Sequence, residues 1–234
     1  MKILGYIPAR LGSERTKAKN LRVLNGRPLI SYAIDTCRNA KTPSGFFVNT
    51  ESSEIANVSR EYGIDVYMRD PALAASTTKT DEIVIDFIQK NPCDAVVLVN
   101  PTAPFLRPET IDLAIDQFVK TGADGLFSTN ALRKHALMKG QPLNFDPSGQ
   151  SPRTQDLEPI VYINFIICIF RSATALANYN ETGSFLYKGN LEFMLMAEEQ
   201  SVDIDYDIDF RMAEALMAAG ENDPSYYGLH PEAV

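Results

Sequence analysis

The sequence predicts a single-domain α/β fold in which a mostly parallel, mixed sheet lies between two layers of helices, the three-layer Rossmann-like arrangement. The chain has 234 residues, 45% of them hydrophobic, which suits one domain with one core. Short apolar runs alternate with stretches of helical period from the first residues onward, as in repeated β-α-β units. No linker or internal repeat interrupts this alternation.

Each expected element follows from its local pattern. Short apolar runs predict strands at residues 3–7, 45–50, 65–68, 95–99, 125–129, 160–170 and 191–197. Apolar residues at helical intervals predict helices around residues 28–37, 53–62, 80–89, 111–119 and 210–217. Pro28 is tolerated in a first helical turn because no backbone donor is needed there, and a serine suits the N-cap of the second helix.

Charge and cysteine content disfavour several classes of protein. The net charge is −8 and the pI about 4.9, so the chain lacks the cationic face that binds nucleic acid or an anionic membrane. Cys37, Cys93 and Cys168 stand far apart among apolar neighbours, which predicts reduced core thiols and neither a disulfide framework nor a zinc site. There is no signal-peptide pattern and no long apolar run, so we expect a cytoplasmic protein.

Residues 133–160 lack the pattern of either element. This stretch is rich in Gly, Pro, Asn, Gln and Ser and is longer than an ordinary connection. It indicates a functional arm or an oligomer contact, with low order as the alternative.

A cationic segment follows the first predicted strand. Residues 10–27 contain six basic side chains and only one acidic one, Glu14, whereas the rest of the chain is strongly acidic. A basic loop at the carboxyl end of a strand lies where open α/β sheets bind ligands, and a polyphosphate suits its charge. Its glycine spacing matches neither a P-loop nor the G-x-G-x-x-G of dinucleotide binders.

An acidic segment lies near the other end of the chain. Residues 201–210 read SVDIDYDIDF, so that aspartates alternate with other residues. If extended, the segment places four carboxylates on one face about 7 Å apart, and two of them converging on Mg²⁺ would relieve their repulsion. The alternatives are a solvated strand edge, or a helix cap made by Asp207 or Asp209. A basic phosphate loop and an acidic metal site together predict nucleotidyl transfer.

Several motifs resemble those of the sugar cytidylyltransferases, which make CMP-N-acetylneuraminate and related CMP-activated 2-keto-3-deoxy acids. The opening motifs are IPARLGSER at 7–15, KNL at 19–21 and GRPLI at 26–30. Later ones are RDPALA at 69–74, NPTAP at 100–104, DID at 203–205 and DF at 209–210. The resemblance spans essentially the whole chain. It implies the nucleotidyltransferase version of the fold, the substrates CTP and an acidic sugar, Mg²⁺, and a homodimer in which residues 133–160 form a dimerisation and sugar-site arm.

The resemblance also implies roles for individual residues. The nucleotide-binding positions would be Arg10, Gly12, Ser13, Arg15, Lys19, Asn20 and Arg69. Asp203 and Asp205 would hold Mg²⁺, and Asn100, Arg153 and Asn164 would contact the sugar. Arg10, Lys19 and Asp205 would be catalytic: the cations stabilise charge at the α-phosphate, and an aspartate helps to deprotonate the anomeric hydroxyl that displaces pyrophosphate.

The sequence departs from the family pattern on the sugar side. Asn100 stands where the family usually has glutamine, and the following Pro-Phe-Leu-Arg is one residue longer than usual. Residues 164–168 read NFIIC where the family has Asn-Gly-Ala-Ile-Tyr. These departures predict retained phosphate chemistry with a sugar pocket that differs from one for N-acetylneuraminate.

Other functions share some of these features. The D-x-D pattern at residues 203–205 also occurs in glycosyltransferases of the related nucleotide-sugar fold, although here it lies unusually late in the chain. A nucleotidyltransferase using another nucleoside triphosphate or a sugar phosphate, and a catalytically silent nucleotide-binding homologue, are further alternatives. Release of pyrophosphate from a free triphosphate distinguishes the first class from the others.

Overall fold

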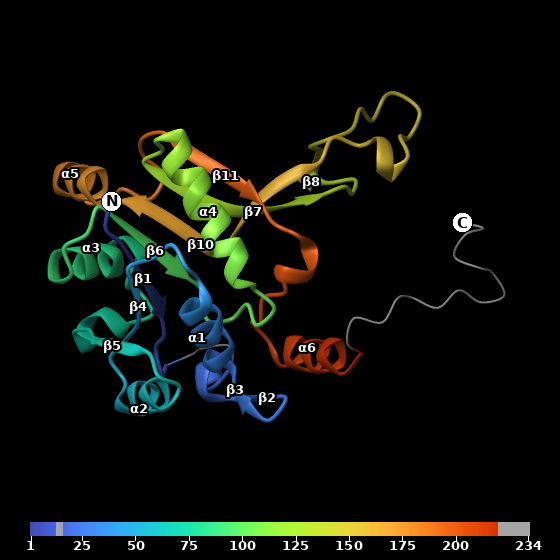
Figure 1. Cartoon of the computed structure of the whole chain (residues 1–234). Helices are drawn as coiled ribbons and strands as arrows, with labels where there is room; N and C mark the ends of the chain where they lie inside the picture. The colour runs from blue at the N-terminus through green and yellow to red at the C-terminus, as the bar shows by residue number, and fades with distance from the viewer. Residues whose placement is uncertain (13–15, 220–234) are drawn as a thin grey trace.

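Seven strands form the central sheet of the computed structural model, which describes residues 1–12 and 16–219 (Figure 1). The strands are β1 (Ile3–Pro8), β4 (Gly45–Thr50), β5 (Asp65–Met68), β6 (Ala95–Val99), β7 (Gly125–Leu132), β10 (Ile160–Arg171) and β11 (Leu191–Leu195). Their order is β11-β7-β10-β6-β1-β4-β5. Only β10 among them runs antiparallel to its neighbours, which confirms the predicted mixed, mostly parallel sheet.

Helices cover both faces of this sheet, so the three-layer prediction is also confirmed. The helices are α1 (Leu29–Asn39), α2 (Ser53–Glu61), α3 (Thr80–Lys90), α4 (Pro108–Thr121), α5 (Ser172–Thr182) and α6 (Asp207–Ala219). Ile34 of α1, Ile55 of α2 and Ile115 of α4 are buried in one apolar cluster. Phe87 of α3 and Ala175 of α5 belong to a second cluster on the opposite face.

Several smaller elements complete the described part of the chain. Two short hairpins pair β2 (Val23–Leu24) with β3 (Arg27–Pro28), and β8 (Leu137–Met138) with β9 (Gln141–Pro142). Single 3-10 turns are η1 (Lys19–Leu21), η2 (Pro71–Ala74), η3 (Thr154–Asp156) and η4 (Glu198–Gln200). None of the helices in the described ranges combines the length and apolar character needed to cross a membrane.

The local differences from the predicted elements have physical causes. Helix α5 was not predicted, because its sequence SATALANYNET carries few large apolar residues and contributes only Ser172 and Ala175 as buried positions. Pro28 immediately precedes α1 and does not lie within its first turn. Val119 of α4 is half exposed although its spacing predicted burial. In α2, the predicted serine cap is Ser52, whose hydroxyl accepts a hydrogen bond from the Ile55 N–H.

Residues 133–159 form an arm that projects from the end of β7 and β10 (Figure 1). Asn144 ties the arm together, because its Nδ2 donates to the carbonyls of Lys134 at 3.0 Å and Glu158 at 2.9 Å. Its Oδ1 accepts from the Ala136 N–H at 3.1 Å. The arm therefore has defined internal hydrogen bonds, while its apolar side chains Leu137 and Met138 are largely exposed.

The parallel strands deliver their carboxyl ends to one edge of the sheet. The loops after β1, β4, β5 and β6 meet there, and the amino-terminal half of the antiparallel β10 reaches the same edge. Helix α6 closes this edge from the side, with Phe210 packed in a small cluster that also holds Leu24, Leu29 and Ile204. Open α/β sheets bind their ligands at this edge.

Candidate active site

The loop after β1 brings the cationic segment to this edge. Asn20 ties the two ends of this loop together, because its Nδ2 donates to the backbone carbonyl of Arg10 at 3.1 Å. Asn20 is buried, and its Oδ1 has no partner within the described part of the chain. Gly12 is exposed. Two of the predicted nucleotide-binding residues, Ser13 and Arg15, lie outside the described residues.

Lys19 joins the cationic segment to the acidic one. Its Nζ donates to the Ile204 carbonyl at 2.8 Å and lies 2.9 Å from Oδ1 of Asp205. Thr16 adds a third contact, because its hydroxyl donates to the Asp205 carbonyl at 3.0 Å. Two stretches that are nearly two hundred residues apart in sequence therefore meet directly.

The acidic segment is anchored to the core through Ile204. Ile204 is fully buried, and its N–H donates to the Thr102 carbonyl at 2.9 Å. Asp203 and Asp205 flank it on the exposed side, and the Thr102 hydroxyl is hydrogen-bonded to Asp203 Oδ1. Asp209, in the first turn of α6, reaches back and accepts from the N–H groups of Asp205 and Tyr206, the two residues before the helix, at 2.8 and 2.7 Å.

This geometry corrects the expectation of one extended face with four carboxylates. Helix α6 begins at Asp207, so Asp207 and Asp209 lie in a helical turn, and only Asp203 and Asp205 keep the extended spacing. The alternative that one of the later aspartates caps the helix is confirmed for Asp209.

Asp203 and Asp205 suit a hard divalent cation. Partial desolvation raises the pKa of Asp203, and the negative charges of Asp205 and Asp209 raise it further, against the lowering effect of the Thr102 hydrogen bond and Lys19. A cation would relieve this crowding of charge. No group of three or more His, Cys, Asp or Glu side chains within residues 1–12 and 16–219 is arranged as a complete metal site. Mg²⁺ is typically held by one or two carboxylates, with substrate phosphates and water as its other ligands, so two carboxylates fit that ion.

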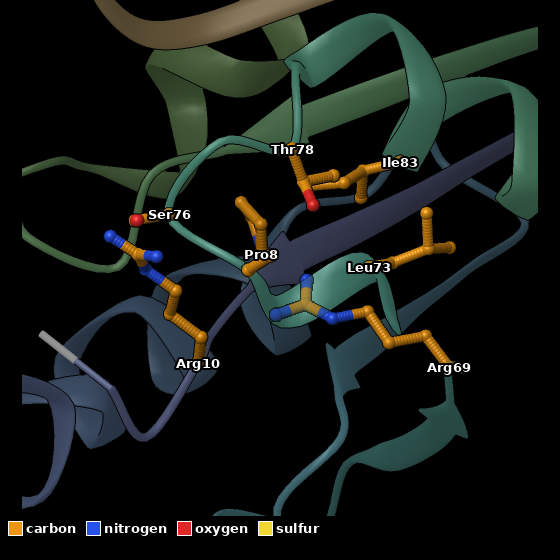
Figure 2. Close-up of a pocket in the computed structure, with 8 residues that line it drawn as sticks. Pro8, Arg10, Arg69, Leu73, Ser76, Thr78 and Ile83 are labelled. Carbon is orange, nitrogen blue, oxygen red and sulfur yellow. The ribbon is translucent and has the colours of Figure 1, made fainter. Parts of the chain in front are cut away.

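A pocket of about 260 Å³ lies beside the cationic loop, between the end of β1 and the residues that follow β5 (Figure 2). It is lined by Pro8, Arg10, Arg69, Leu73, Ala75, Ser76, Thr78 and Ile83. Arg10 reaches across its mouth and donates to the Ala74 carbonyl at 3.4 Å. The contact to the acidic segment is thus made by Lys19, while Arg10 faces this pocket.

Arg69 forms a charged wall of the same pocket. Its side chain is 2% exposed and pairs with Glu51, whose Oε2 lies 2.8 Å from Nη2. Nε of Arg69 is buried without a partner among the described residues. The other oxygen of Glu51 accepts from the Leu11 N–H at 2.9 Å. Glu51 therefore links the pocket to the cationic loop, a role that its position directly after a predicted strand could have indicated.

Two of the predicted sugar-binding residues lie at the same edge of the sheet. Asn100 follows β6, and its Oδ1 accepts from the Thr102 N–H at 3.3 Å and lies 2.8 Å from the Thr102 hydroxyl oxygen. Asn164 in β10 donates to Asn130 Oδ1 at 2.7 Å. Arg153 is separate: it is exposed on the arm and pairs there with Asp156, at 2.7 and 3.1 Å.

The two departures in β10 have different consequences. Cys168 is 1% exposed and lies in the apolar cluster of the α3 face, where burial raises the pKa of its thiol. It is a core residue. Phe165 has a φ of 58°, a left-handed conformation that a bulky residue rarely adopts. It lies where the ladder between β10 and β7 shifts register, and where the family carries glycine.

The assembled edge has the parts needed for chemistry on a triphosphate. Arg10 and Lys19 supply positive charge, the pocket beside Arg69 offers room for a ring, and Asp203 and Asp205 offer carboxylate oxygens. Positioning and charge stabilisation account for most of the catalysis of such transfers.

Comparison with known proteins agrees with this assignment. Residues 4–216 match the cytidylyltransferase family. The chain is 33% identical over 232 residues to a CMP-N,N'-diacetyllegionaminic acid synthase of Legionella pneumophila, covering 93% of this chain and 97% of that protein. It is 30% identical to an N-acylneuraminate cytidylyltransferase of Oncorhynchus mykiss, covering 99% of this chain but only 53% of the fish protein.

Solved structures share the fold at low identity. A CMP:2-keto-3-deoxy-manno-octonic acid synthetase complexed with CTP superposes with a TM-score of 0.71 at 16% identity, covering 94% of this chain and 99% of that one. A 4-diphosphocytidyl-2C-methyl-D-erythritol synthase from Anaerococcus prevotii gives a TM-score of 0.65 at 12% identity, covering 93% and 96%. Fold and site thus define a nucleotidyltransferase. Within that class, the chain belongs to the cytidylyltransferase family.

Proposed function

We propose that this protein transfers CMP from CTP to the anomeric hydroxyl of an acidic 2-keto-3-deoxy sugar of the sialic-acid-like nonulosonate class, releasing pyrophosphate. The contact between Lys19 and Asp205 carries the proposal, because it joins the cationic loop to the acidic segment beside a pocket. The Legionella and trout relatives, named as a CMP-legionaminic acid synthase and an acylneuraminate cytidylyltransferase, support the choice of nucleotide and sugar class.

The nucleotide is assigned to the pocket and the cationic loop. Its cytosine and ribose would occupy the space beside Arg69, and Arg10 at the mouth would meet the phosphates. The remaining phosphate contacts are assigned to Gly12, Ser13, Arg15, Lys19 and Asn20. In the free protein the Lys19 ammonium is paired with the Asp205 carboxylate. When the α-phosphate binds, its negative charge would compete for the ammonium and weaken this ion pair.

Mg²⁺ is assigned to Asp203 and Asp205. When bound, it would neutralise the triphosphate and the crowded carboxylates together. The carboxylate oxygens of these residues are also the acceptors available for the proton of the sugar hydroxyl, and Asp205 is proposed as the catalytic one. Thr102 holds Asp203 in orientation through its hydroxyl.

The sugar is assigned to the edge near Asn100 and Asn164, with Arg153 as the partner of its carboxylate. A guanidinium binds a carboxylate through two parallel hydrogen bonds, as Arg153 now does with Asp156. Phe165, whose ring packs against Phe127, stands where the family carries glycine, and this departure supports a sugar other than N-acetylneuraminate itself.

A homodimer would bring the arm into contact with a neighbouring site. The arm of residues 133–159 projects from the end of β7 and β10 (Figure 1), and Arg153 on it is exposed and paired only within the arm, with Asp156. Exposed apolar side chains continue from the arm onto the sheet, with Leu137, Met138, Val161 and Tyr162 all at least half exposed. A second copy covering them would bury this surface and could place Arg153 at the neighbouring site. The free cysteines Cys37, Cys93 and Cys168 support a reducing compartment, the cytoplasm.

A pyrophosphate-release screen tests the proposed function. Four nucleoside triphosphates are crossed with a panel of 2-keto-3-deoxy acids of eight and nine carbons, with and without Mg²⁺. We expect release only with CTP, an acid sugar and Mg²⁺ together. Binding of CTP without release from any sugar would support the silent homologue, and consumption of a preformed nucleotide sugar would support a glycosyltransferase.

A further inference from the structure

A chain of side-chain hydrogen bonds runs from β10 to the acidic segment. Asn164 Nδ2 donates to Asn130 Oδ1 at 2.7 Å, and Asn130 Nδ2 donates in turn to Ser201 Oγ at 2.8 Å. The Ser201 hydroxyl then donates to the Ala197 carbonyl at 2.9 Å. Ser201 lies two residues before Asp203, so this chain fixes the start of the acidic segment.

A second chain leaves the same part of β10 and reaches the same segment. The Ile166 carbonyl accepts from the Asn100 N–H at 2.9 Å, and Asn100 Oδ1 accepts from the Thr102 N–H at 3.3 Å. Thr102 is hydrogen-bonded to Asp203 through its hydroxyl and to the Ile204 N–H through its carbonyl. The acidic segment is thus held on two sides from one point of origin.

That origin is the irregular turn of β10 around Phe165. The ladder to β7 shifts register between Ile163 and Cys168, and Phe165 has a φ of 58°. The Ile166 N–H bonds to the side chain of Asn164, at 3.1 Å. A strained, non-glycine conformation persists only where its surroundings hold it.

The amide of Asn164 is committed to protein partners. Its Oδ1 accepts from the Ile166 N–H and from the Ser128 hydroxyl, and its Nδ2 donates to Asn130. Asn130 is 4% exposed and uses both ends of its own amide. A buried amide whose donor and acceptor are both matched has one orientation, so the pair transmits a fixed geometry.

We propose that Asn130, Asn164 and Ser201 are positioning residues that set the acidic segment for metal binding, so that Asn164 acts through this chain and not by contact with the sugar. The inference rests on the proposed function, because it assigns Asp203 and Asp205 to the metal. It predicts that breaking the chain weakens the response to divalent metal and leaves nucleotide binding in the pocket intact, since Arg10 and Arg69 take no part in the chain.

Ser201→Ala is the decisive variant, because it removes one hydroxyl at the last link and adds no bulk. We expect the Mg²⁺ concentration for half-maximal activity to rise about tenfold, the lower end of what the loss of a contact behind a metal ligand typically costs. Ser201→Thr keeps the hydroxyl and should restore the normal metal response. Ser59→Ala is the matched control: its buried hydroxyl donates to the Ile55 carbonyl within α2 and has no link to the site.

Two binding measurements separate positioning from a merely structural role. Mn²⁺ affinity in the presence of CTP is followed by electron paramagnetic resonance, and CTP affinity in EDTA by calorimetry. Weaker Mn²⁺ binding in Ser201→Ala with CTP affinity within twofold of wild type supports the proposal. An unchanged Mn²⁺ affinity, or an equal loss in Ser59→Ala, overturns it.

The proposed function fails in a different way. If wild-type protein binds Mn²⁺ and CTP but releases no pyrophosphate, the transfer reaction is wrong, while the Mn²⁺ comparison still decides the positioning role. Asn164→Ala tests the first residue of the hydrogen-bond chain with the same measurements. If that variant does not fold, the Ser201 variants still decide the proposal.

Discussion

Lys19 and Asp205 form the contact on which the site is built: the ammonium lies 2.9 Å from the carboxylate and also donates to the Ile204 carbonyl at 2.8 Å. Their side chains are 15% and 35% exposed, so the pair lies at the rim of the site and a substrate can reach it. An ammonium that bridges a carboxylate and a backbone carbonyl fixes the loop after β1 against the segment before α6. Under the proposed function, the same cation would meet an arriving phosphate.

Removing either charge should abolish turnover and leave the fold intact. We expect Asp205→Asn and Lys19→Met each to lower pyrophosphate release by about a hundredfold or more, because a group aimed at developing charge is lost. A partly exposed ion pair contributes at most about 1 kcal/mol, so the free energy of unfolding in urea should change little. Undiminished release in Asp205→Asn would remove that carboxylate from the mechanism.

Glu51→Gln should disturb both the pocket and the loop. Glu51 pairs with the 2% exposed Arg69 side chain and accepts from the Leu11 N–H. Leaving a buried guanidinium without its counter-charge should lower the free energy of unfolding by roughly 2 to 4 kcal/mol and weaken CTP binding. The exposed Glu61 at the end of α2 provides the control, and Glu61→Gln should behave as wild type in chemical denaturation and calorimetry. Equal behaviour of the two variants would contradict the assigned role.

Phe165 offers a test of stored backbone strain. Replacement by alanine removes the ring from its contact with Phe127 and keeps the left-handed conformation, whereas glycine removes both the ring and the strain. We therefore expect Phe165→Gly to be more stable than Phe165→Ala by about 1 kcal/mol in urea denaturation. At Ala131, in the regular part of β7, Ala→Gly should instead destabilise. If Phe165→Ala is instead more stable than Phe165→Gly, as is usual for this pair of residues, the backbone at position 165 is not strained.

Mixed subunits test whether the arm acts on a neighbouring site. If Arg153 serves the partner's site, a mixture of Arg153→Ala and Asp205→Asn chains regains one intact site in each mixed dimer. Random exchange then gives about a quarter of wild-type activity from two inactive proteins, given one isologous dimer. Activity that stays at the level of the separate variants after exchange would mean that Arg153 does not act across subunits.

Much of the fold was predictable because its signals are local. β4, β5 and β6 have the predicted boundaries, since each is a short apolar run between turn residues or helix caps. Helix α5 escaped prediction because little of its surface is buried. The prediction of an extended segment over residues 201–210 failed because helix α6 begins at Asp207. A periodic pattern in sequence cannot show such a switch, because it depends on Phe210 and Ile204 packing against α1.

The sequence predicted some of the site residues and missed others, for the same reason. Lys19 and Asp205 were predicted as separate charged motifs, and their contact follows from the topology that brings strand ends together. Glu51, Thr102, Asn130 and Ser201 were missed, because an isolated polar residue carries no signal until its hydrogen-bond partners are known. The sequence could not show that the backbone of Phe165 is strained, although a phenylalanine in place of the family's glycine marked this position as unusual.

Phosphorus NMR of the reaction mixture tests the central claim most directly, because it shows which phosphorus of the triphosphate is attacked. With wild-type protein, CTP, Mg²⁺ and an acidic nonulosonate, we predict that the triphosphate signals give way to pyrophosphate and a single phosphodiester resonance from the CMP-sugar. Formation of CDP and inorganic phosphate, or CTP that persists with every acid sugar offered, would contradict the account.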